Sequence, residues 1–180
     1  DRFFVAEGSW GHSKAVLSLE ESHHCVRVMR KSAGDKIEVF DGAGRWARGI
    51  IAEGSDREVT VLVEEEGKVQ GKKPALLMAV AVTKGKTMEL VIQKAVELGV
   101  DRIQPLLTEN VAVHWSVEIL KGKQEKWRRV AVEACKQCGQ NIVPEVCPVV
   151  AFEDVLESRD EGVRLLASLD QRAQPLRCEM

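Results

Sequence analysis

The sequence contains no tyrosine and only four tryptophans and four phenylalanines among its 180 residues. A protein that holds nucleic-acid bases mainly by stacking needs more aromatic side chains than this. It also lacks an excess of one charge, because 26 lysines and arginines stand against 28 aspartates and glutamates, giving a net charge of −2. Attraction of RNA or DNA by an overall positive field is excluded, so any such role must come from local basic patches.

Long apolar runs and a disulfide pattern are also missing. The longest apolar run, residues 75–82, is far shorter than the roughly 20 residues of a membrane span. The chain starts Asp1-Arg2-Phe3-Phe4, without an initiator methionine or the regions of a signal peptide. Its five cysteines are odd in number and widely spread, which disfavours a disulfide framework. These features indicate a cytoplasmic protein without a membrane anchor.

Glycine and proline divide the chain into two parts. Nine of the fourteen glycines lie in residues 1–73, which contain no proline, whereas residues 74–180 contain all five prolines. The segment 67–74 between them is polar and carries two glycines, as linkers do. We therefore expect two domains, residues 1–70 and 74–180.

The first part has the pattern of short strands and one helix. Ser18 and Glu21 have capping-box spacing, which predicts a helix that begins at Ser18 and extends to about Arg30. Three segments alternate apolar and polar side chains, as half-buried strands do: residues 36–40, 45–52 and 58–63. Short strands at close spacing with one helix are typical of a small β-barrel.

The second part has longer helices. The apolar run 75–82 predicts a strand buried on both faces. Met88, Ile92 and Ala95 share one face of the helix that follows, and Gly99 is its expected end. A second helix is expected from a cap at Ser116 to Gly139, with an apolar stripe formed by Trp127, Val130, Ala131, Ala134 and Cys138.

Strands and helices alternate in this part, which predicts a parallel sheet with helical crossovers. Its expected strands are residues 75–82, 102–107, 145–150 and 163–169. Ligands of such sheets bind beyond the carboxyl ends of the strands. In this chain those ends are expected near residues 83–86, 108–110 and 169–171.

Three groups of basic side chains could bind an anion. His23, Arg27, Arg30 and Lys31 have the spacing of one helix face. Lys84-Gly85-Lys86 lies between a strand and a helix, where an anion is favoured, although it is not a Walker loop. The third group is the run Lys121, Lys123, Lys126, Arg128 and Arg129. The residues alone favour ordinary solvated side chains for the first and third groups, and they leave that interpretation open for the lysines of the turn.

The Cys135-Lys136-Gln137-Cys138 segment has the C-x-x-C spacing of zinc ligands. No second pair of ligands follows in the second part of the chain, so we expect no metal. Cys138 continues the apolar stripe of its helix and is interpreted as a small core residue.

Several blocks of the chain resemble one family in collinear order. The blocks are residues 2–5, 21–30, 34–42, 84–100, 133–139 and 143–146, and residues 88–99 (Met-Glu-Leu-Val-Ile-Gln-Lys-Ala-Val-Glu-Leu-Gly) are the most specific. They are similar to the RsmE family, bacterial 16S ribosomal RNA uridine N3-methyltransferases. The likeness covers nearly the whole chain.

The resemblance implies an α/β protein with a PUA-like RNA-binding β-barrel at residues 1–70. A SPOUT methyltransferase domain of the trefoil-knot class follows at residues 74–180, incomplete at its C-terminus. It further implies a cytoplasmic homodimer, S-adenosylmethionine as the methyl donor, and a uridine of 16S rRNA in the small ribosomal subunit as substrate.

The resemblance also assigns candidate site residues. Lys84, Lys86 and Gln137 would hold the uracil or its phosphate, because a cationic pocket stabilises negative charge when N3 loses its proton. Leu169, Asp170 and Gln171 would touch the methyl donor. Glu89, Gln93 and Glu97 are expected to be structural. RNA contacts are expected from Arg2, Arg27, Arg30, Lys31, Lys123 and Arg128.

The chain departs from the family pattern in three places. Asn110 and Gln140 stand where family members usually carry arginine, which removes two cations. The chain also ends before the family's Gly-Pro-Glu-Gly loop and Leu-Arg-x-Glu-Thr segment, which build the knot and most of the donor site. We therefore expect the natural protein to be longer and these 180 residues alone to be inactive. The alternative function is a non-catalytic RNA-binding module.

Overall fold

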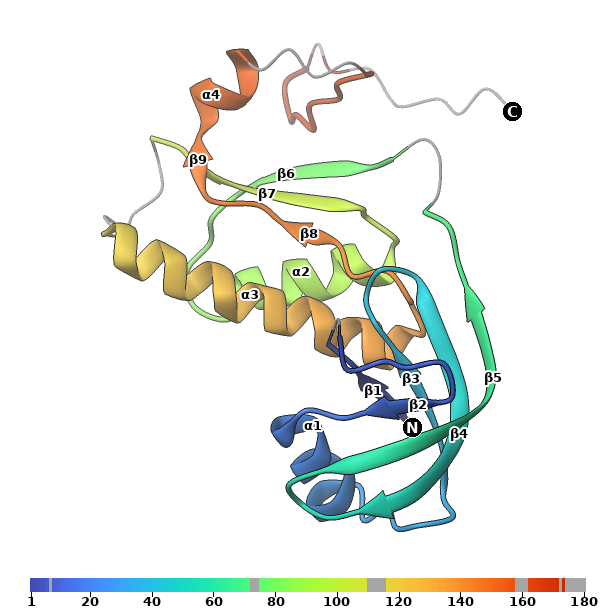
Figure 1. Cartoon of the computed structure of the whole chain (residues 1–180). Helices are drawn as coiled ribbons and strands as arrows, with labels where there is room; N and C mark the ends of the chain where they lie inside the picture. Colours follow the sequence, from blue (N-terminus) through green and yellow to red (C-terminus); the bar gives the residue numbers. More distant parts are fainter. Residues whose placement is uncertain (7, 72–74, 110–115, 158–161, 172, 174–180) are drawn as a thin grey trace.

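The structure is a computed structural model, and it describes residues 1–6, 8–71, 75–109, 116–157, 162–171 and 173. Two sheets are stacked along the molecule, with two long helices between them (Figure 1). The N-terminal sheet contains β1 (Arg2–Phe4), β2 (Lys14–Val16), β3 (Lys36–Phe40), β4 (Arg45–Gly54) and β5 (Val59–Lys68). Its strand order is β1-β3-β4-β5-β2.

This sheet is a curled half-barrel, so the expected β-barrel forms only in part. The described residues form no pairing between the edge strands β1 and β2, so the sheet stays open. Its curvature comes from β4 and β5, whose pairing has irregularities at Arg48/Gly49 and after Ile51. A Cβ on Gly49 would lie 2.0 Å from the Leu62 carbonyl oxygen, so only glycine permits this close pairing.

The helix expected over residues 18–30 forms in two pieces. The Ser18 side chain accepts a hydrogen bond from the Glu21 amide, which confirms the cap of α1 (Leu19–His23). The chain then widens into a π-helical turn, η1 (His24–Val28). Arg30 adopts φ = +55°, a conformation that interrupts the helix.

The second sheet is parallel throughout. It consists of β6 (Leu77–Ala81), β7 (Arg102–Leu107), β8 (Glu145–Val146) and β9 (Val150–Ala151), and both β8 and β9 pair with β7. The crossovers are α2 (Thr87–Glu97) and α3 (Val117–Cys138), and α4 (Phe152–Glu157) follows β9. The order of strands and helices up to α4 confirms the expected α/β arrangement.

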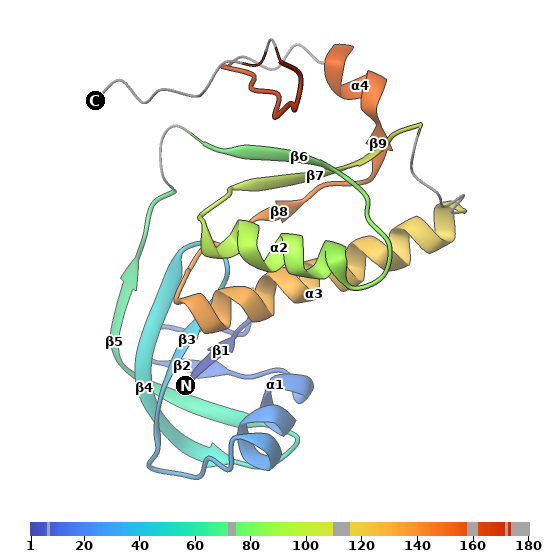
Figure 2. The same cartoon turned by 180° about the vertical axis from the view of Figure 1, so that it is seen from behind.

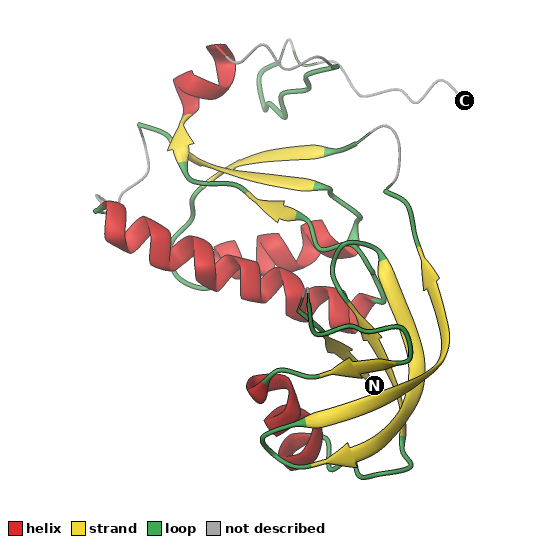
Figure 3. Cartoon of the chain, in the orientation of Figure 1, coloured by secondary structure: helices red, strands yellow, loops and turns green. Residues whose placement is uncertain are grey.

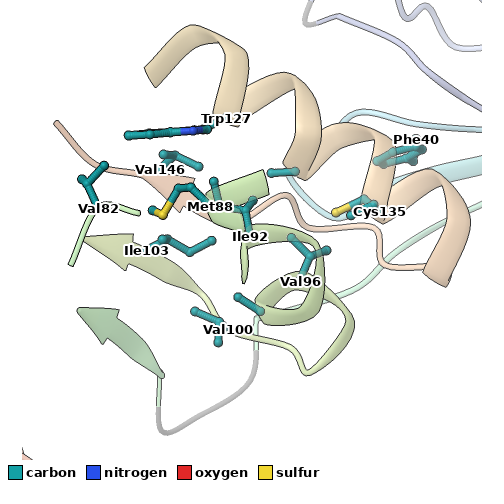
Figure 4. Packing of buried hydrophobic residues seen from close by; sticks show 13 residues of the cluster. Phe40, Val82, Met88, Ile92, Val96, Val100, Ile103, Trp127, Cys135 and Val146 are labelled. Carbon is teal, nitrogen blue, oxygen red and sulfur yellow. The ribbon is translucent and has the colours of Figure 1, made fainter. Parts of the chain in front are cut away.

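The helices α2 and α3 lie side by side on one face of this sheet (Figure 2). Their apolar stripes meet the sheet in one core, in which Met88, Ile92, Ile103 and Trp127 are almost fully buried (Figure 4). Both helices end at glycines in the left-handed region, Gly99 at φ = +80° and Gly139 at φ = +81°, as expected. Cys138 is exposed, so its expected place in the core is wrong, and Cys135 is the buried cysteine of that turn.

Two expected strands differ from the structure. The segment 75–82 is buried on one face only, because in the described residues no helix covers the other face of β6; Leu76 and Leu77 are 54% and 38% exposed. Residues 163–169 are not a strand but an exposed segment without regular structure (Figure 3). The single strand expected over residues 145–150 forms as two short strands, β8 and β9, so the sheet still has four strands. Pro148 lies between them and has no amide hydrogen to bond to the neighbouring strand.

The two domains share contacts beyond the linker. Phe40 of β3 is fully buried in the core of the second domain. The turn before β4 pairs with the segment after α3, where the Gly44 amide donates to the Asn141 carbonyl and the Val143 amide donates to the Gly42 carbonyl. The N-terminal sheet is therefore held against the C-terminal end of α3.

Candidate functional site

The carboxyl edge of the parallel sheet is where this topology places ligands. β6 ends there in the turn 83–86, and β7 and β9 end at the same edge because all four strands are parallel. The N-terminus of α2 begins beside that turn (Figure 2). The edge thus gathers the Lys84-Gly85-Lys86 turn and the first amides of α2.

The turn itself presents two lysines to solvent. Gly85 has φ = +64°, a conformation that a side chain would strain, and its backbone has open space around it. Lys84 and Lys86 are exposed, and within the described residues neither has a carboxylate at ion-pair distance. Lys86 is the N-cap of α2 and its side chain makes no capping bond. Both ammonium groups can therefore meet an anionic ligand.

The carboxylates of α2 are held by neighbouring side chains. Glu89 lies 2.5 Å from the Lys126 ammonium on α3, and the hydrogen bond from Lys126 lowers the pKa of Glu89. Glu97 accepts hydrogen bonds from Gln93 and Lys94 at 3.1 and 2.7 Å, and the bond from Lys94 lowers the pKa of Glu97. These contacts agree with the structural role expected for the three residues.

Gln137 is not part of this edge. It lies on the last turn of α3, and α3 starts at the carboxyl edge and runs 22 residues away from it. At 1.5 Å per residue this separates Gln137 from the carboxyl edge by about 30 Å. Within one chain the structure does not bring Gln137 together with Lys84 and Lys86, contrary to our grouping of the three around one uracil.

The residues expected to touch the methyl donor do not form a binding site in the described structure either. Leu169, Asp170 and Gln171 are exposed in the segment 162–171, which has no regular structure. The Asp170 amide donates a hydrogen bond to the Ser168 hydroxyl at 3.1 Å. Their role stays a prediction. Asn110, the other departure at this edge, lies outside the described residues.

The cations of α1 and η1 are partly paired. Arg27 makes a 2.6 Å ion pair with Asp56, and its hydrogen bonds lower the pKa of that carboxyl. Lys31 lies 3.0 Å from the Asp1 carboxylate. Arg30 and His23 are exposed, and Arg30 stands outside the helix at its positive φ. Of the expected basic face, Arg30 is the arginine with most freedom to meet a phosphate.

The basic run on α3 is a mixed surface. Arg128 is 3.3 Å from Glu125 one turn earlier, and Lys123 is half-buried. Lys121 and Arg129 are exposed. The run remains a candidate RNA contact on the opposite side of the interdomain boundary from α1.

The side chain of Arg2, an expected RNA contact, bonds to other residues of the protein. Its side chain is 12% exposed and donates to the carbonyls of Cys135 and Gln140 and to the side chain of Asn141. Its Nε lies 2.8 Å from the Glu38 carboxylate, an ion pair that is not aligned as a hydrogen bond. The guanidinium also lies 4.6 Å from the centre of the Phe40 ring. Arg2 thus ties β1 to the end of α3 and drops out of the candidate RNA surface.

Sequence reasoning missed Lys136. Its side chain is 3% exposed, and its ammonium lies 2.9 Å from Glu21 on α1 and 2.9 Å from Glu133 on α3. The His24 Nδ1 is 3.5 Å away. Burial alone would lower the pKa of Lys136, but the hydrogen bonds and charges of the two carboxylates outweigh burial and raise it. The one signal in the sequence was its position beside the apolar stripe. We call Arg2, Glu21, Cys135 and Lys136 the interdomain seam.

The four cysteines that the structure describes do not form a metal site. Cys135 is buried, which raises the pKa of its thiol to about 12, and its sulfur is 3.6 Å from the Ile142 carbonyl oxygen. Across the described ranges no three His, Cys, Asp or Glu side chains gather as metal ligands. In the same part of the chain, no helix combines the length and apolar character needed to cross a membrane.

Both domains match known protein families. Residues 71–178 match the family described as "RNA methyltransferase domain", and residues 18–64 match the one described as "RNA methyltransferase PUA domain". The half-barrel sheet is therefore PUA-like, and the parallel α/β domain is the methyltransferase domain.

Curated relatives carry the name "Ribosomal RNA small subunit methyltransferase E". The chain is 35% identical to the Aquifex aeolicus protein, over 90% of this chain and 69% of the relative. It is 32% identical to that of Mesomycoplasma hyopneumoniae over 92% and 70%, and 30% identical to that of Bacillus subtilis over 88% and 62%. The chain thus spans roughly two thirds of the length of these relatives, and about half of others.

Solved structures agree with the sequence matches. A putative methyltransferase from Legionella pneumophila, in complex with the cofactor SAM, has a TM-score of 0.79 at 29% identity, over 88% of this chain and 66% of that one. A ribosomal RNA small subunit methyltransferase E from Neisseria gonorrhoeae, bound to S-adenosyl methionine, has a TM-score of 0.78 at 25% identity with the same coverage. The chain belongs to the RsmE family of RNA methyltransferases with a PUA domain.

Proposed function

We propose that the protein methylates N3 of a uridine in 16S rRNA of the small ribosomal subunit, with S-adenosylmethionine as donor. The observation that carries this proposal is the match of both domains, in the same order, to proteins named ribosomal RNA small subunit methyltransferase E. Two of the similar solved structures contain S-adenosylmethionine. The substrate, the position methylated and the donor are proposals for this chain, since it spans about two thirds of those relatives.

Lys84 and Lys86 are the residues through which this chain would act on the RNA. N3 of uracil carries a proton, and its loss places negative charge on the flanking carbonyl oxygens. An exposed ammonium at the carboxyl edge stabilises that charge or holds the neighbouring phosphate. Because there is open space around Gly85, a ligand can approach the backbone of this turn closely.

The donor side is not built by the described residues. When bound, S-adenosylmethionine supplies a methyl group on a good leaving group, so that positioning becomes the main task of the enzyme. The exposed residues 169–171 form no cradle around such a molecule. They do not fit the donor as they stand, and we derive no step through it. The second candidate function is an RNA-binding module without turnover, which needs no donor site.

The two candidate functions differ in donor binding and methyl transfer. We expect the full-length enzyme to transfer labelled methyl groups to small ribosomal subunits, and Lys84→Ala and Lys86→Ala each to lower the rate about 100-fold through lost charge stabilisation. Lys94→Ala, an exposed lysine paired on α2, is the matched control and should retain full activity. Normal methylation by both variants would contradict the role of the turn.

The 180-residue chain in the same assay tests its expected inactivity. Binding to small ribosomal subunits without methyl transfer would favour the RNA-binding module for this chain. Transfer would show that these residues suffice. Homodimerisation and a cytoplasmic location are further proposals, and light scattering of the purified protein measures the former.

A further inference from the structure

Two helices carry expected RNA contacts, and they belong to different domains. The α1–η1 helix and the turn after it carry Arg27 and Arg30, while α3 carries Lys123 and Arg128. In both views α1 lies beneath the C-terminal half of α3 (Figures 1 and 2). A single RNA can contact both helices only if the angle between the domains is held.

One buried side chain connects these two helices directly. The Lys136 ammonium on α3 donates to both carboxylate oxygens of Glu21 on α1, at 2.9 and 3.2 Å, across 115 positions of sequence. Glu21 is 8% exposed, so this pair is removed from solvent at both ends. His24, at the start of η1, places its Nδ1 3.5 Å from the same ammonium. The contact therefore involves both pieces of the helix that carries Arg27.

The geometry of Lys136 differs from that of every surface pair on these helices. The pairs Arg27–Asp56 and Arg128–Glu125 are exposed and each lies within its own domain. An exposed pair contributes little to a fixed geometry, because solvent screens it and both side chains can leave. When this pair separates, Glu133 still compensates Lys136, but Glu21 loses its partner. An unpaired buried carboxylate penalises every arrangement of the two helices that separates them. Arg2 adds a second, partly buried link to the same turn of α3.

We propose that the Lys136–Glu21 pair is a fixed joint that holds the α1–η1 helix and α3 at the angle needed to contact one ribosomal RNA together. Lys136 is then a positioning residue that touches no RNA itself. The RNA part of this inference rests on the proposed function, whereas the fixed angle does not.

The test measures domain orientation and RNA affinity on the same variants. In Lys136→Gln we expect the residual dipolar couplings of the α1–η1 helix no longer to fit its orientation relative to α3 in the unmodified protein, while the couplings within each domain are unchanged. We expect its affinity for purified small ribosomal subunits to fall about 10-fold, since two linked contacts become independent. Lys94→Gln, which breaks an exposed pair within α2, is the matched control and should change neither reading.

Glu21→Gln is the milder variant, in case Lys136→Gln does not fold. It keeps a hydrogen-bond acceptor for Lys136, and Glu133 still compensates the ammonium. We expect a smaller change in the same direction in both measurements, and Lys136→Arg, which keeps the charge, should lie closer to the unmodified protein than Lys136→Gln.

Three results would overturn the inference. Unchanged couplings in Lys136→Gln or Glu21→Gln would show that the pair does not fix the angle. Altered couplings with unchanged affinity would show that the angle does not matter for RNA. If the unmodified protein itself fails to bind small ribosomal subunits, the proposed function fails with the RNA part, while the couplings still decide whether the joint exists.

Discussion

The interdomain seam and the carboxyl edge use the same kinds of side chain for opposite purposes. At the seam, Lys136 is buried and Arg2 is partly buried, and each has at least two partners within the protein. At the edge, Lys84 and Lys86 are exposed, and the described residues provide them with no carboxylate at ion-pair distance. A cation whose bonds are satisfied inside the fold serves architecture, whereas one left in water can bind a ligand. Net charge and local charge runs do not separate the two.

The largest difference is expected from replacing one cation in each region by methionine. Arg2→Met removes the donor that serves the Gln140 carbonyl and the Asn141 side chain. It also removes one of the two guanidinium partners of Glu38, which keeps Arg48. We therefore expect a loss of about 2 kcal/mol in the free energy of unfolding. Lys86→Met, on the exposed turn, should stay within about 0.5 kcal/mol. Urea unfolding measures both values. Equal losses would remove the distinction between the two regions.

High pH provides a second, smaller way to examine the seam. The pKa of Lys136 is raised, so the stability that it contributes is fully present below the unfolded lysine pKa of about 10.4 and is lost as pH rises through its higher folded value. Glu21, Glu133 and His24 are the titratable groups that face it. We expect the stability gap between the unmodified protein and Lys136→Met to be constant up to about pH 10 and to shrink above it.

The comparison with Lys136→Met is needed because other groups also titrate. Burial raises the thiol pKa of Cys25 to about 11 and that of Cys135 to about 12, so both proteins lose stability above the ordinary thiol pKa. This loss is common to both and cancels in the gap. A gap that is constant up to pH 12 would show that the ammonium of Lys136 contributes nothing to stability.

Much of the local structure was predictable because its causes are local. The caps at Ser18 and Ser116 and the glycine ends at Gly99 and Gly139 depend on residues within one turn, and all four are confirmed. The strand over residues 102–107 is confirmed for the same reason. The strand predicted from the apolar residues of segment 163–169 is wrong. A strand also needs a neighbouring strand to pair with, and in the described residues the sheet does not pair with this segment.

The site was harder to predict because its causes are distant in sequence. No pattern near Lys136 indicates a carboxylate 115 positions earlier, so its burial was missed. The position of Gln137 was within reach of sequence reasoning: a crossover helix starts at the carboxyl edge and ends at the opposite one. The resemblance grouped Gln137 with Lys84 by motif, and the topology separates them by the length of α3.

The smallest effect on stability is expected from chemical modification of Cys138, on the exposed side of the last turn of α3. Cys135 and Cys138 are three positions apart, yet Cys135 is buried and Cys138 is exposed. Burial raises the pKa of Cys135 to about 12, so its thiol stays almost entirely protonated at pH 7.5, and the thiolate is the reactive form. We therefore expect iodoacetamide to modify Cys138 at least 100-fold faster, by peptide mapping, with no change in the midpoint of thermal unfolding. Because Arg2 holds the Cys135 carbonyl, comparable rates at the two cysteines would mean that this turn opens readily, and the seam could then fix neither α3 nor the angle between the domains.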